Sequence, residues 1–301
     1  MSPHPAPSDE RRGPAGTALG YLDWLFNPFQ RRDAQAVYDL LGTGAITAEG
    51  LYLNLGYWAE EDDLDAASAA LARLVADTAG FGPEDTVLDV GFGFADQDLL
   101  WVRSHEPARI IGLNITASQV AVARQRVVEA GLEERIELCE GSATAMPLAD
   151  ASVDCVVALE SAFHFQTRAD FFAEAYRVLR PGGRLVTADI IPLPPAKRAV
   201  DRLRQRLSWW LVASRFAIPE ANRYTRLAYP GYLTAAGFVD VHVRSIREQV
   251  YAPLHAWLRA HPETLERIHP VARLPARWAR RMDADRLYAG LDYILASAVR
   301  P

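Results

Sequence analysis

The stretch VLDVGFGFADQDLLW, residues 87–101, decides the fold. It begins with a short apolar run, turns over Gly91 and Gly93, and continues into a segment that could form a helix. A strand that turns over glycines into a helix is the first unit of an α/β nucleotide-binding fold. The third glycine of a dinucleotide-binding loop would fall at Asp96, whose charge would lie beside phosphate. The stretch therefore predicts a ligand-binding turn and disfavours a pyrophosphate ligand.

An aspartate before the glycines indicates the kind of ligand. Asp89 lies two residues before Gly91, and Asp-x-Gly-x-Gly suits an adenosyl ligand without phosphates whose amino-acid end is a zwitterion. Gly91 and Gly93 let the backbone approach such a ligand closely. The alternative interpretation is a tight strand-to-helix turn, as in any α/β protein.

Apolar strand-like runs alternate with helical patterns along most of the chain. A helix is expected at 65–80, another from Thr116 to near Gly131, and a third that the Pro-Gly-Gly at 181–183 ends. The expected strands are 86–90, 108–114, 136–141, 153–161, 184–191, 239–246 and 291–299. This alternation predicts an α/β fold with a Rossmann-like, seven-stranded, mainly parallel sheet that helices cover on both faces.

Three parts of the chain differ in composition. Residues 1–16 are proline-rich and polar, which predicts a disordered tail. Residues 17–80 are expected to form a helical cover, with apolar positions at helical spacing between 19 and 42. Residues 81–301 are expected to form the main domain, with a helical lid inserted at about 192–227.

Composition excludes some classes of protein. The 301 residues carry a net charge of −6, and half of them are hydrophobic, which is a poor match to nucleic-acid binding. The prolines near the start argue against a signal peptide, and the longest apolar stretch is too short to insert across a membrane. Cys139 and Cys155 lie in apolar strand-like stretches, which predicts buried thiols and a cytoplasmic protein.

Several motifs occur together in a recognisable order. They are LYLNLGYW, LDVGFGFADQDLLW, ARIIGLNITASQ, EGSATAMPLADASVD, ALESAFHF, RVLRPGGRLVTADIIPL and YLTAAGFVDV. In this order and spacing the chain resembles class I S-adenosylmethionine-dependent methyltransferases. It is most similar to the small-molecule O-methyltransferases of antibiotic biosynthesis, of the erythromycin and rebeccamycin type, and more distantly to the mycolic acid cyclopropane synthases. The resemblance covers residues 45–250 and is poor at the ends and over 192–220.

The resemblance implies S-adenosylmethionine as the cofactor and indicates which residues would bind it. Gly91 and Gly93 would contact the methionine part. Asn114 stands where an acidic residue usually meets the ribose, with Gln119 assisting it or lying exposed on a helix. Ser142 stands where an aspartate usually meets the adenine. The predicted cofactor-binding residues are Tyr52, Asp89, Gly91, Phe92, Gly93, Asn114, Ile115, Gln119, Ser142, Ala143 and Glu160.

Two of these assignments leave alternatives open. Tyr52 matches a tyrosine that reaches the cofactor's carboxylate in the cyclopropane synthases, and core packing is its alternative. Glu160 would serve the cofactor's ammonium or pair with an arginine. Tyr57 and Trp58 are candidates to cover the site, although core packing is favoured for Trp58.

Methyl transfer to an aliphatic hydroxyl requires removal of a proton. His164 follows the fourth expected strand and Asp189 ends the fifth, so both lie at the carboxyl edge of the sheet, where ligands bind. The resemblance to the rebeccamycin sugar enzymes implies that this pair acts at the acceptor. We expect His164 to be the general base, with Asp189 orienting it or holding the substrate. A purely structural histidine is the alternative.

The insert is expected to close over an apolar acceptor. Its aromatic residues would form a pocket roof, a homodimer contact or ordinary core. The predicted substrate-binding residues are Tyr57, Phe163, Trp209, Trp210, Phe216 and Tyr224. The expected acceptor is a polyketide, a macrolide glycoside or an isoprenoid. Arg202, Arg204 and Arg206 are predicted to form a solvated face, although an anionic acceptor such as a prenyl diphosphate would need them turned inward.

Three functions remain open on the sequence. The favoured one is O-methylation of a small apolar metabolite. The second is C- or N-methylation of a similar scaffold, and the third is a cofactor-binding cyclase or binding module that does not methylate. No catalytic metal is expected, because the acidic run at 60–63 lies in a polar turn.

Overall fold

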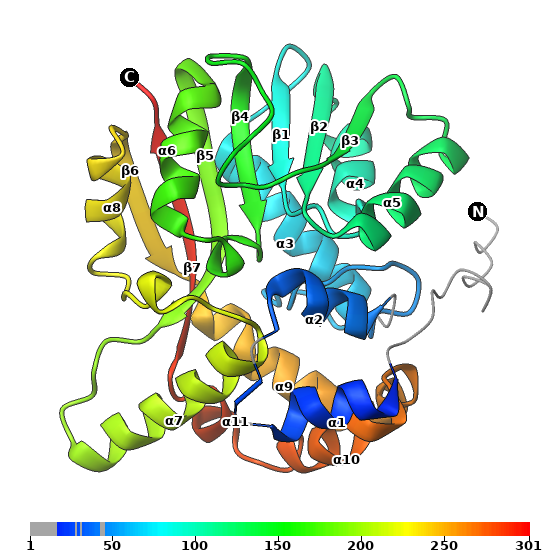
Figure 1. The fold of residues 1–301 in the computed structure, drawn as a ribbon, viewed down its shortest axis with the longest axis vertical. Helices are drawn as coiled ribbons and strands as arrows, with labels where there is room; N and C mark the ends of the chain where they lie inside the picture. The colour runs from blue at the N-terminus through cyan, green and yellow to red at the C-terminus, as the bar shows by residue number, and fades with distance from the viewer. Residues whose placement is uncertain (1–16, 28, 31, 43–45) are drawn as a thin grey trace.

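A seven-stranded sheet forms the centre of the molecule (Figure 1). The structure is a computed structural model that describes residues 17–27, 29–30, 32–42 and 46–301, so the tail predicted at 1–16 lies outside it. The strand order is β3-β2-β1-β4-β5-β7-β6, and β7 runs antiparallel to both of its neighbours. The strands are β1 Thr86–Val90, β2 Arg109–Asn114, β3 Ile136–Glu140, β4 Val153–Leu159, β5 Leu179–Pro192, β6 Val239–Ser245 and β7 Leu291–Val299. The predicted fold class is confirmed.

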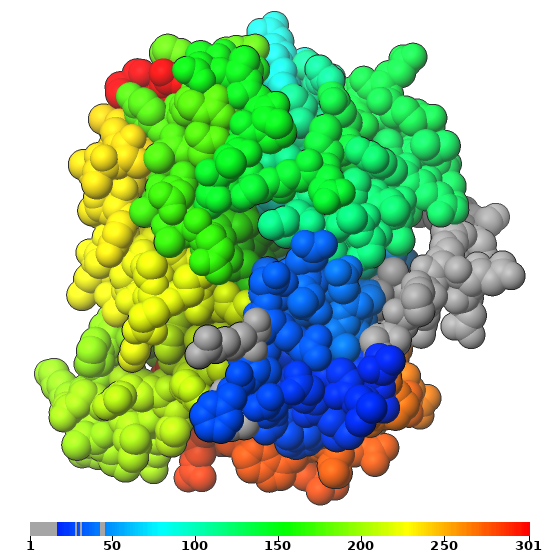
Figure 2. All heavy atoms as spheres, viewed as in Figure 1, coloured from blue at the N-terminus to red at the C-terminus, as the bar shows by residue number. Residues whose placement is uncertain are grey.

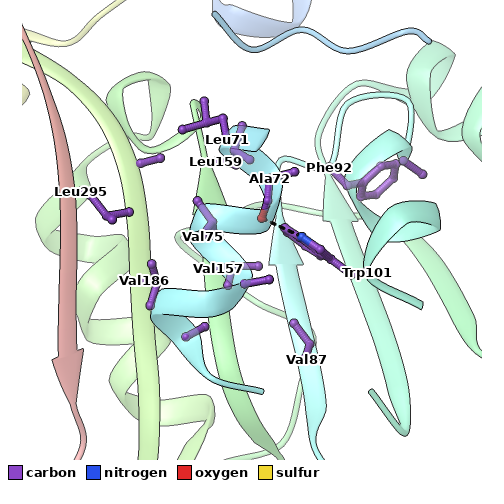
Figure 3. Close-up of a cluster of buried hydrophobic side chains, with 14 of the residues drawn as sticks. Leu71, Ala72, Val75, Val87, Phe92, Trp101, Val157, Leu159, Val186 and Leu295 are labelled. Carbon is purple, nitrogen blue, oxygen red and sulfur yellow. Dashed lines mark hydrogen bonds between the residues drawn. The ribbon is translucent and has the colours of Figure 1, made fainter. Parts of the chain in front are cut away.

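Alternate side chains of the strands enter two separate cores. Val87 and Val157 belong to the core on one face, whereas Leu88 and Val156 belong to the core on the other. Because β1 and β4 are buried on both faces, they read as continuous apolar runs in the sequence. Figure 3 shows the first core, where the Trp101 indole donates to the backbone oxygen of Ala72 over 2.9 Å.

Helices supply the outer layers of both cores. The first core takes side chains from α3 (Leu64–Ala79), α4 (Asp96–Ser104) and α5 (Ala117–Glu129), and the second from α6 (Arg168–Val178) and α8 (Tyr229–Ala235). The expected helix at 65–80 is therefore α3, which Asp63 caps at its start and Gly80, at φ +61°, ends. α3 packs on the sheet, whereas the predicted domain division places this helix in the N-terminal helical cover, residues 17–80.

One helix boundary predicted from the sequence is wrong. The helix before the Pro-Gly-Gly at 181–183 was expected to run up to it, but α6 ends at Val178 and β5 begins at Leu179. Leu179 pairs with Val153 of β4. Because that pairing extends the strand backwards, the Pro-Gly-Gly lies inside β5, in its exposed first part.

The remaining helices gather at the carboxyl edge of the parallel strands (Figure 1). They are α1 Ala18–Phe26, α2 Ala34–Leu41, α7 Ala199–Arg215, α9 Tyr251–Ala260, α10 Pro270–Ala279 and α11 Ala284–Leu287. The insert predicted at 192–227 is helical, as α7 shows. Three-residue 3₁₀ turns lie at Ala162–His164, Glu220–Asn222 and Arg247–Gln249, and a longer one at Pro262–Arg267.

The two cysteines differ in burial. Cys155 is fully buried and burial raises its pKa to about 12, but Cys139 is only partly buried because its strand lies at the sheet edge. The prediction of two buried thiols is therefore wrong for Cys139.

Over the residues that the structure describes, no helix combines the length and the apolar character needed to cross a bilayer.

Candidate active site

A cavity of about 340 Å³ lies at the carboxyl edge of the sheet. Its walls are the turns after β1, β2, β3 and β4, the segment 51–54 and one side of α2. In Figure 2 the side chains of α2, in blue, cover this edge below the green and teal turns. The volume and the mixed polar and apolar lining suit a small-molecule ligand.

Most of the predicted cofactor residues line this cavity. They are Gly91, Phe92, Gly93, Asn114, Ile115, Gln119, Ser142, Ala143 and Glu160. They come from four different turns, which the parallel sheet brings to one edge. Tyr52 and Asp89 are not among the lining residues.

The glycine turn leaves no room for a side chain. Gly91 has φ +88°, and a Cβ there would lie 2.4 Å from the Cβ of Ser161. The Ser161 hydroxyl donates to the backbone oxygen of Val90 over 2.6 Å, and the Gly91 N–H donates to the oxygen of Leu113 over 2.7 Å. The turn is thus clamped between β2 and the end of β4, and its backbone faces the cavity.

Two amides stand at the end of β2. The Asn114 side chain donates to Gln119 Oε1 over 2.8 Å, and its own oxygen accepts from the Thr116 N–H over 3.0 Å. The Nε2 of Gln119 is buried and has no partner among the described residues. A buried donor without an acceptor is costly, so this amide fits a ligand hydroxyl such as those of a ribose.

The turn after β3 is polar at its tip. The hydroxyls of Ser142 and Thr144 lie 3.0 Å apart, and the Thr144 N–H donates to Ser142 Oγ over 3.2 Å. Both residues line the cavity. A hydroxyl pair is a neutral partner for the polar edge of a base.

Glu160 is a buried carboxyl group in the cavity wall. Its Oε1 accepts from the Leu55 N–H over 2.6 Å and from the Tyr293 hydroxyl over 2.7 Å. Among the described residues, Oε2 is the oxygen left for a ligand. Burial raises the pKa of Glu160 to about 7, although both hydrogen bonds oppose that shift. Of the two predicted roles, pairing with an arginine finds no support in these contacts.

Asp96 acts differently from the sequence expectation. Its carboxylate pairs with the Arg126 guanidinium at 2.6 and 2.7 Å and accepts from the Leu51 N–H over 3.2 Å. The charge is therefore neutralised, and Asp96 does not line the cavity. The expectation that Asp96 would repel a phosphate is wrong, because the side chain instead ties the segment at 51–54 to α4 and α5.

Asp89 and Tyr52 lie behind the cavity wall. Asp89 is fully buried and accepts from the Gln97 amide over 3.0 Å, and burial raises its pKa to about 7. Burial and the neighbouring carboxylate of Asp89 also raise the pKa of Asp98 well above its ordinary value. Tyr52 is partly buried, and Asp96 raises its pKa further beyond the effect of burial. Direct cofactor contact by these two residues stays a prediction that the lining does not support.

His164 faces the cavity from the 3₁₀ turn after β4. Its Nε2 lies 2.9 Å from the hydroxyl of Tyr38, a residue of α2 that also lines the cavity. Burial lowers the pKa of His164 to about 3, so the imidazole is neutral at physiological pH. Burial likewise raises the pKa of Tyr38, which keeps the phenol protonated. A neutral base and a neutral phenol therefore meet at the cavity wall.

Asp189 does not reach His164. No hydrogen bond between described residues joins the two, and Asp189 is absent from the lining. Its carboxylate lies 2.7 Å from Arg168 Nε and accepts from the Tyr229 hydroxyl over 3.0 Å. The expectation that Asp189 orients the base directly or holds the substrate is unsupported, because a fully buried arginine occupies its charge.

Asn222 fixes the turn that carries His164. This fully buried residue donates from Nδ2 to the backbone oxygens of Phe163 and Phe165 over 3.1 and 2.8 Å. Its Oδ1 accepts from the Arg168 N–H over 2.9 Å. Through Asn222, the segment after α7 holds the backbone on both sides of the base.

The predicted substrate-binding residues are scattered. Phe163 and Phe216 pack around the His164 ring, with centroids 4.1 and 6.4 Å away. Trp209 is buried in the first core, and Trp210 is 47% exposed. Tyr57 packs against the same core, Trp58 is buried as favoured, and Tyr224 stacks on Tyr232. None of the six predicted residues lines the cavity in the described part of the chain, so their acceptor contacts stay predictions.

The arginines of the insert are exposed, as a solvated face requires. Arg202, Arg204 and Arg206 all lie on the surface of α7, away from the cavity. Among the described residues, no cluster of three or more His, Cys, Asp or Glu side chains is placed to hold a metal ion.

Sequence reasoning missed part of the cavity wall. The residues that it did not name include Gln35, Tyr38, Asn54, Gln97, Thr116, Thr144, Phe165 and Gln166. Gln97, Thr116 and Thr144 lie inside the quoted motifs and close to strand ends, so their position was a usable signal. Tyr38 had none, because nothing local shows that α2 lies across the sheet edge.

Removal of the Arg168 side chain should destabilise the fold. We expect Arg168→Met to lower the free energy of unfolding by about 3–5 kcal/mol, because the buried Asp189 carboxylate would lose its only cationic partner among the described residues. Urea unfolding measures the change. The control is Arg204→Met, which breaks an exposed 3.2 Å pair with Asp201 and should cost at most about 1 kcal/mol. Equal losses in the two variants would contradict this role.

Comparisons with known proteins agree with this geometry. The profile of a family described as "Methyltransferase domain" matches residues 88–187. The chain is 39% identical over 280 residues to the erythromycin 3''-O-methyltransferase of Saccharopolyspora erythraea, covering 89% of this chain and 90% of that protein.

Two solved structures share the fold at lower identity. One is the [4+2]-cyclase SpnF, with a TM-score of 0.64 and 22% identity over 96% of this chain and 98% of that one. The other is geranyl diphosphate C-methyltransferase from Streptomyces coelicolor A3(2), with a TM-score of 0.65 and 18% identity over 96% and 100% of the two chains. At these identities the likeness concerns the fold alone.

Proposed function

Because the chain belongs to the S-adenosylmethionine-dependent methyltransferases, as its 39% identity to a member over 89% of its length shows, we propose that it methylates a hydroxyl of a small, largely apolar secondary metabolite. The observation that supports this proposal most is a neutral histidine in the cavity wall, 2.9 Å from a tyrosine hydroxyl. An aliphatic hydroxyl needs such a base, whereas an amine needs less help.

The cavity offers partners for each part of S-adenosylmethionine. The backbone at Gly91 and Gly93 lines the cavity, where the methionine part can approach it, and Glu160 Oε2 suits the ammonium of the cofactor. Gln119 Nε2, a buried donor without a partner among the described residues, suits a ribose hydroxyl. When bound, S-adenosylmethionine supplies an electrophilic methyl carbon on a sulfonium.

Tyr38 and His164 receive the proton of the acceptor hydroxyl. With the imidazole proton on Nδ1, the Tyr38 hydroxyl donates to His164 Nε2 and keeps a lone pair on its oxygen for the acceptor's proton. As the new oxygen–carbon bond forms, the hydroxyl proton becomes strongly acidic, so a base with a depressed pKa suffices. His164 is buried, and burial raises the pKa of the Tyr38 phenol, which keeps it protonated.

The first acceptors to test are polyketides and macrolide glycosides. This choice rests on the relative from Saccharopolyspora erythraea, whose name gives the 3''-oxygen of erythromycin as its methylation site. The test incubates the protein with S-adenosylmethionine and a panel of hydroxylated acceptors. We expect a product about 14 mass units heavier than its acceptor, the increment for replacing H by CH3. Donor binding without methylation of any acceptor would instead favour a binding module or a cyclase.

Donor affinity should depend on pH through Glu160. The ammonium prefers an ionised carboxylate, and the pKa of Glu160 lies at about 7. We expect the donor to bind about tenfold more tightly at pH 8 than at pH 6. Calorimetry across this range measures the change, and Glu160→Gln should remove most of the pH dependence. An unchanged pH dependence in Glu160→Gln would assign the titration to Asp89 instead.

Glu160 should also make the stability of the unliganded protein depend on pH. We expect this stability to fall over the pH range in which donor affinity rises. The folded protein keeps the Glu160 proton up to about pH 7, whereas the unfolded chain releases it near its ordinary value of 4.5. The folded state binds more protons between these values, so stability falls as pH rises through them and then levels off. Bound donor should offset this loss above pH 7, because it favours the ionised form.

A further inference from the structure

The outer face of α7 is apolar although it lies on the surface. Its inner face buries Ser208 and Trp209 against the rest of the molecule. Its outer face carries five large apolar side chains that are 47% to 56% exposed: Val200, Leu203, Leu207, Trp210 and Leu211. These positions recur at helical spacing, so they form one continuous stripe. We call this stripe the α7 face.

Further exposed apolar side chains lie at the same end of the molecule. Figure 1 shows α1, α7 and α10 together at the end opposite the amino ends of the parallel strands. α10 exposes Leu274 at 75% and Trp278 at 66%, and α1 exposes Leu19 and Phe26. A monomer rarely exposes this much apolar surface in one region unless it meets a partner there.

The same end is strongly basic in an otherwise acidic protein. Residues 197–215 carry six basic side chains and one acidic one, and residues 267–286 carry six arginines and two aspartates. The whole chain has a net charge of −6, so the rest of the molecule is markedly acidic. Arg204 and Arg206 are exposed on the two sides of the α7 face, and Arg202 is exposed farther around the helix. Any partner of this end should therefore be both apolar and anionic.

We propose that the α7 face adsorbs to an anionic lipid surface, with α7 lying along the headgroup layer. Helices with leucine and tryptophan on one side and arginines beside them bind membranes in this way. α7 has 17 residues and does not qualify as a membrane span, which fits a helix that lies on the surface rather than across it. A second copy of the chain fits less well, because two such basic ends would repel each other. This proposal does not depend on the identity of the acceptor.

Vesicle flotation of the full-length protein tests the proposal. The vesicles contain either phosphatidylcholine alone or phosphatidylcholine with about one third phosphatidylglycerol. We expect roughly tenfold more protein to float with the anionic vesicles, because each basic side chain near such a surface adds attraction. Raising the salt concentration from about 0.1 to 0.5 M should release most of it, since the shorter Debye length screens the charges.

Matched variants distinguish vesicle binding through the α7 face from nonspecific adsorption of the protein. Leu207→Glu, at a position 53% exposed, should abolish flotation. Val128→Glu, at a position of α5 that is 58% exposed, should float like the parent protein. Donor binding should be unchanged in both, which shows that they fold. Equal flotation with neutral vesicles, no flotation at all, or a dimer that Leu207→Glu converts to a monomer would each overturn the proposal.

Discussion

His164→Ala is expected to lower kcat by about 10²- to 10⁴-fold at saturating donor and acceptor, the range for loss of a general base. The imidazole is neutral and lies 2.9 Å from the Tyr38 hydroxyl in the cavity wall. Without it, the proton of the acceptor hydroxyl has no base to receive it. Mass detection of the product gives kcat, and calorimetry should show donor affinity within about twofold of the parent value.

The relay through Tyr38 predicts a smaller loss in a second variant. Tyr38→Phe keeps a ring that packs against the His164 ring at 5.3 Å and removes only the hydroxyl. We expect about a tenfold lower kcat, because the acceptor can still approach Nε2. A change in Tyr38→Phe as large as in His164→Ala would make the phenol itself indispensable.

The control for His164 is another buried histidine outside the cavity. His255 lies on α9 and bonds to the backbone oxygen of Met282 over 2.9 Å. His255→Ala should keep kcat while losing some stability. Full turnover in His164→Ala, or an equal loss in His255→Ala, would show that His164 has a structural role only. The kcat profile should also lack an inflection near pH 6.5, because burial moves the pKa of His164 to about 3.

The position of most predicted cofactor residues at one cavity could be predicted from sequence because its determinants are local. Gly91, Gly93 and Asn114 each follow a short apolar run directly, and the parallel sheet brings such positions to one edge. The pairing of Asn114 with Gln119 follows from their spacing at the start of α5. For these residues, the position in the sequence motif predicts the position at the edge of the sheet.

The surroundings of His164 and Asp189 could not be predicted to the same depth because they depend on contacts between distant segments. His164 and Asp189 do end neighbouring strands, but the carboxylate is neutralised by Arg168, which reads in the sequence as an ordinary first residue of a helix. Tyr38 reaches the cavity from a helix 126 positions before His164. Periodicity shows that α2 has an apolar side and does not show where that side docks.

The aromatic insert illustrates a further limit. Trp209 and Trp210 are neighbours in sequence, yet one is buried at 5% exposure and the other is 47% exposed. Both faces of α7 are apolar, so the pattern could not say which face packs inward. Of the aromatic residues predicted to form a pocket roof, a homodimer contact or ordinary core, Trp209 lies in the core and Trp210 lies on the surface.

Gly91→Ala should remove donor binding and destabilise the protein by about 2–5 kcal/mol, combining left-handed backbone strain with overpacking. Gly91 has φ +88°, and a Cβ there would lie 2.4 Å from Ser161 Cβ and 2.8 Å from its Oγ. Ser161 cannot easily retreat, because its hydroxyl is bonded to Val90. The turn must therefore shift, and the cavity wall shifts with it. Urea unfolding and calorimetry with S-adenosylmethionine measure the two effects.

Gly182 supplies a control with nearly the same φ. Its φ is +82°, and a Cβ there would meet nothing within 4 Å, so Gly182→Ala should show the strain alone, about 1–2 kcal/mol. The double variant Gly91→Ala with Ser161→Gly removes the clashing Cβ and should recover the overpacking part. If Gly91→Ala were as mild as Gly182→Ala and still bound the donor, the turn would be more compliant than its contacts imply. The binding site for the methionine part of the donor would then have to lie elsewhere in the cavity.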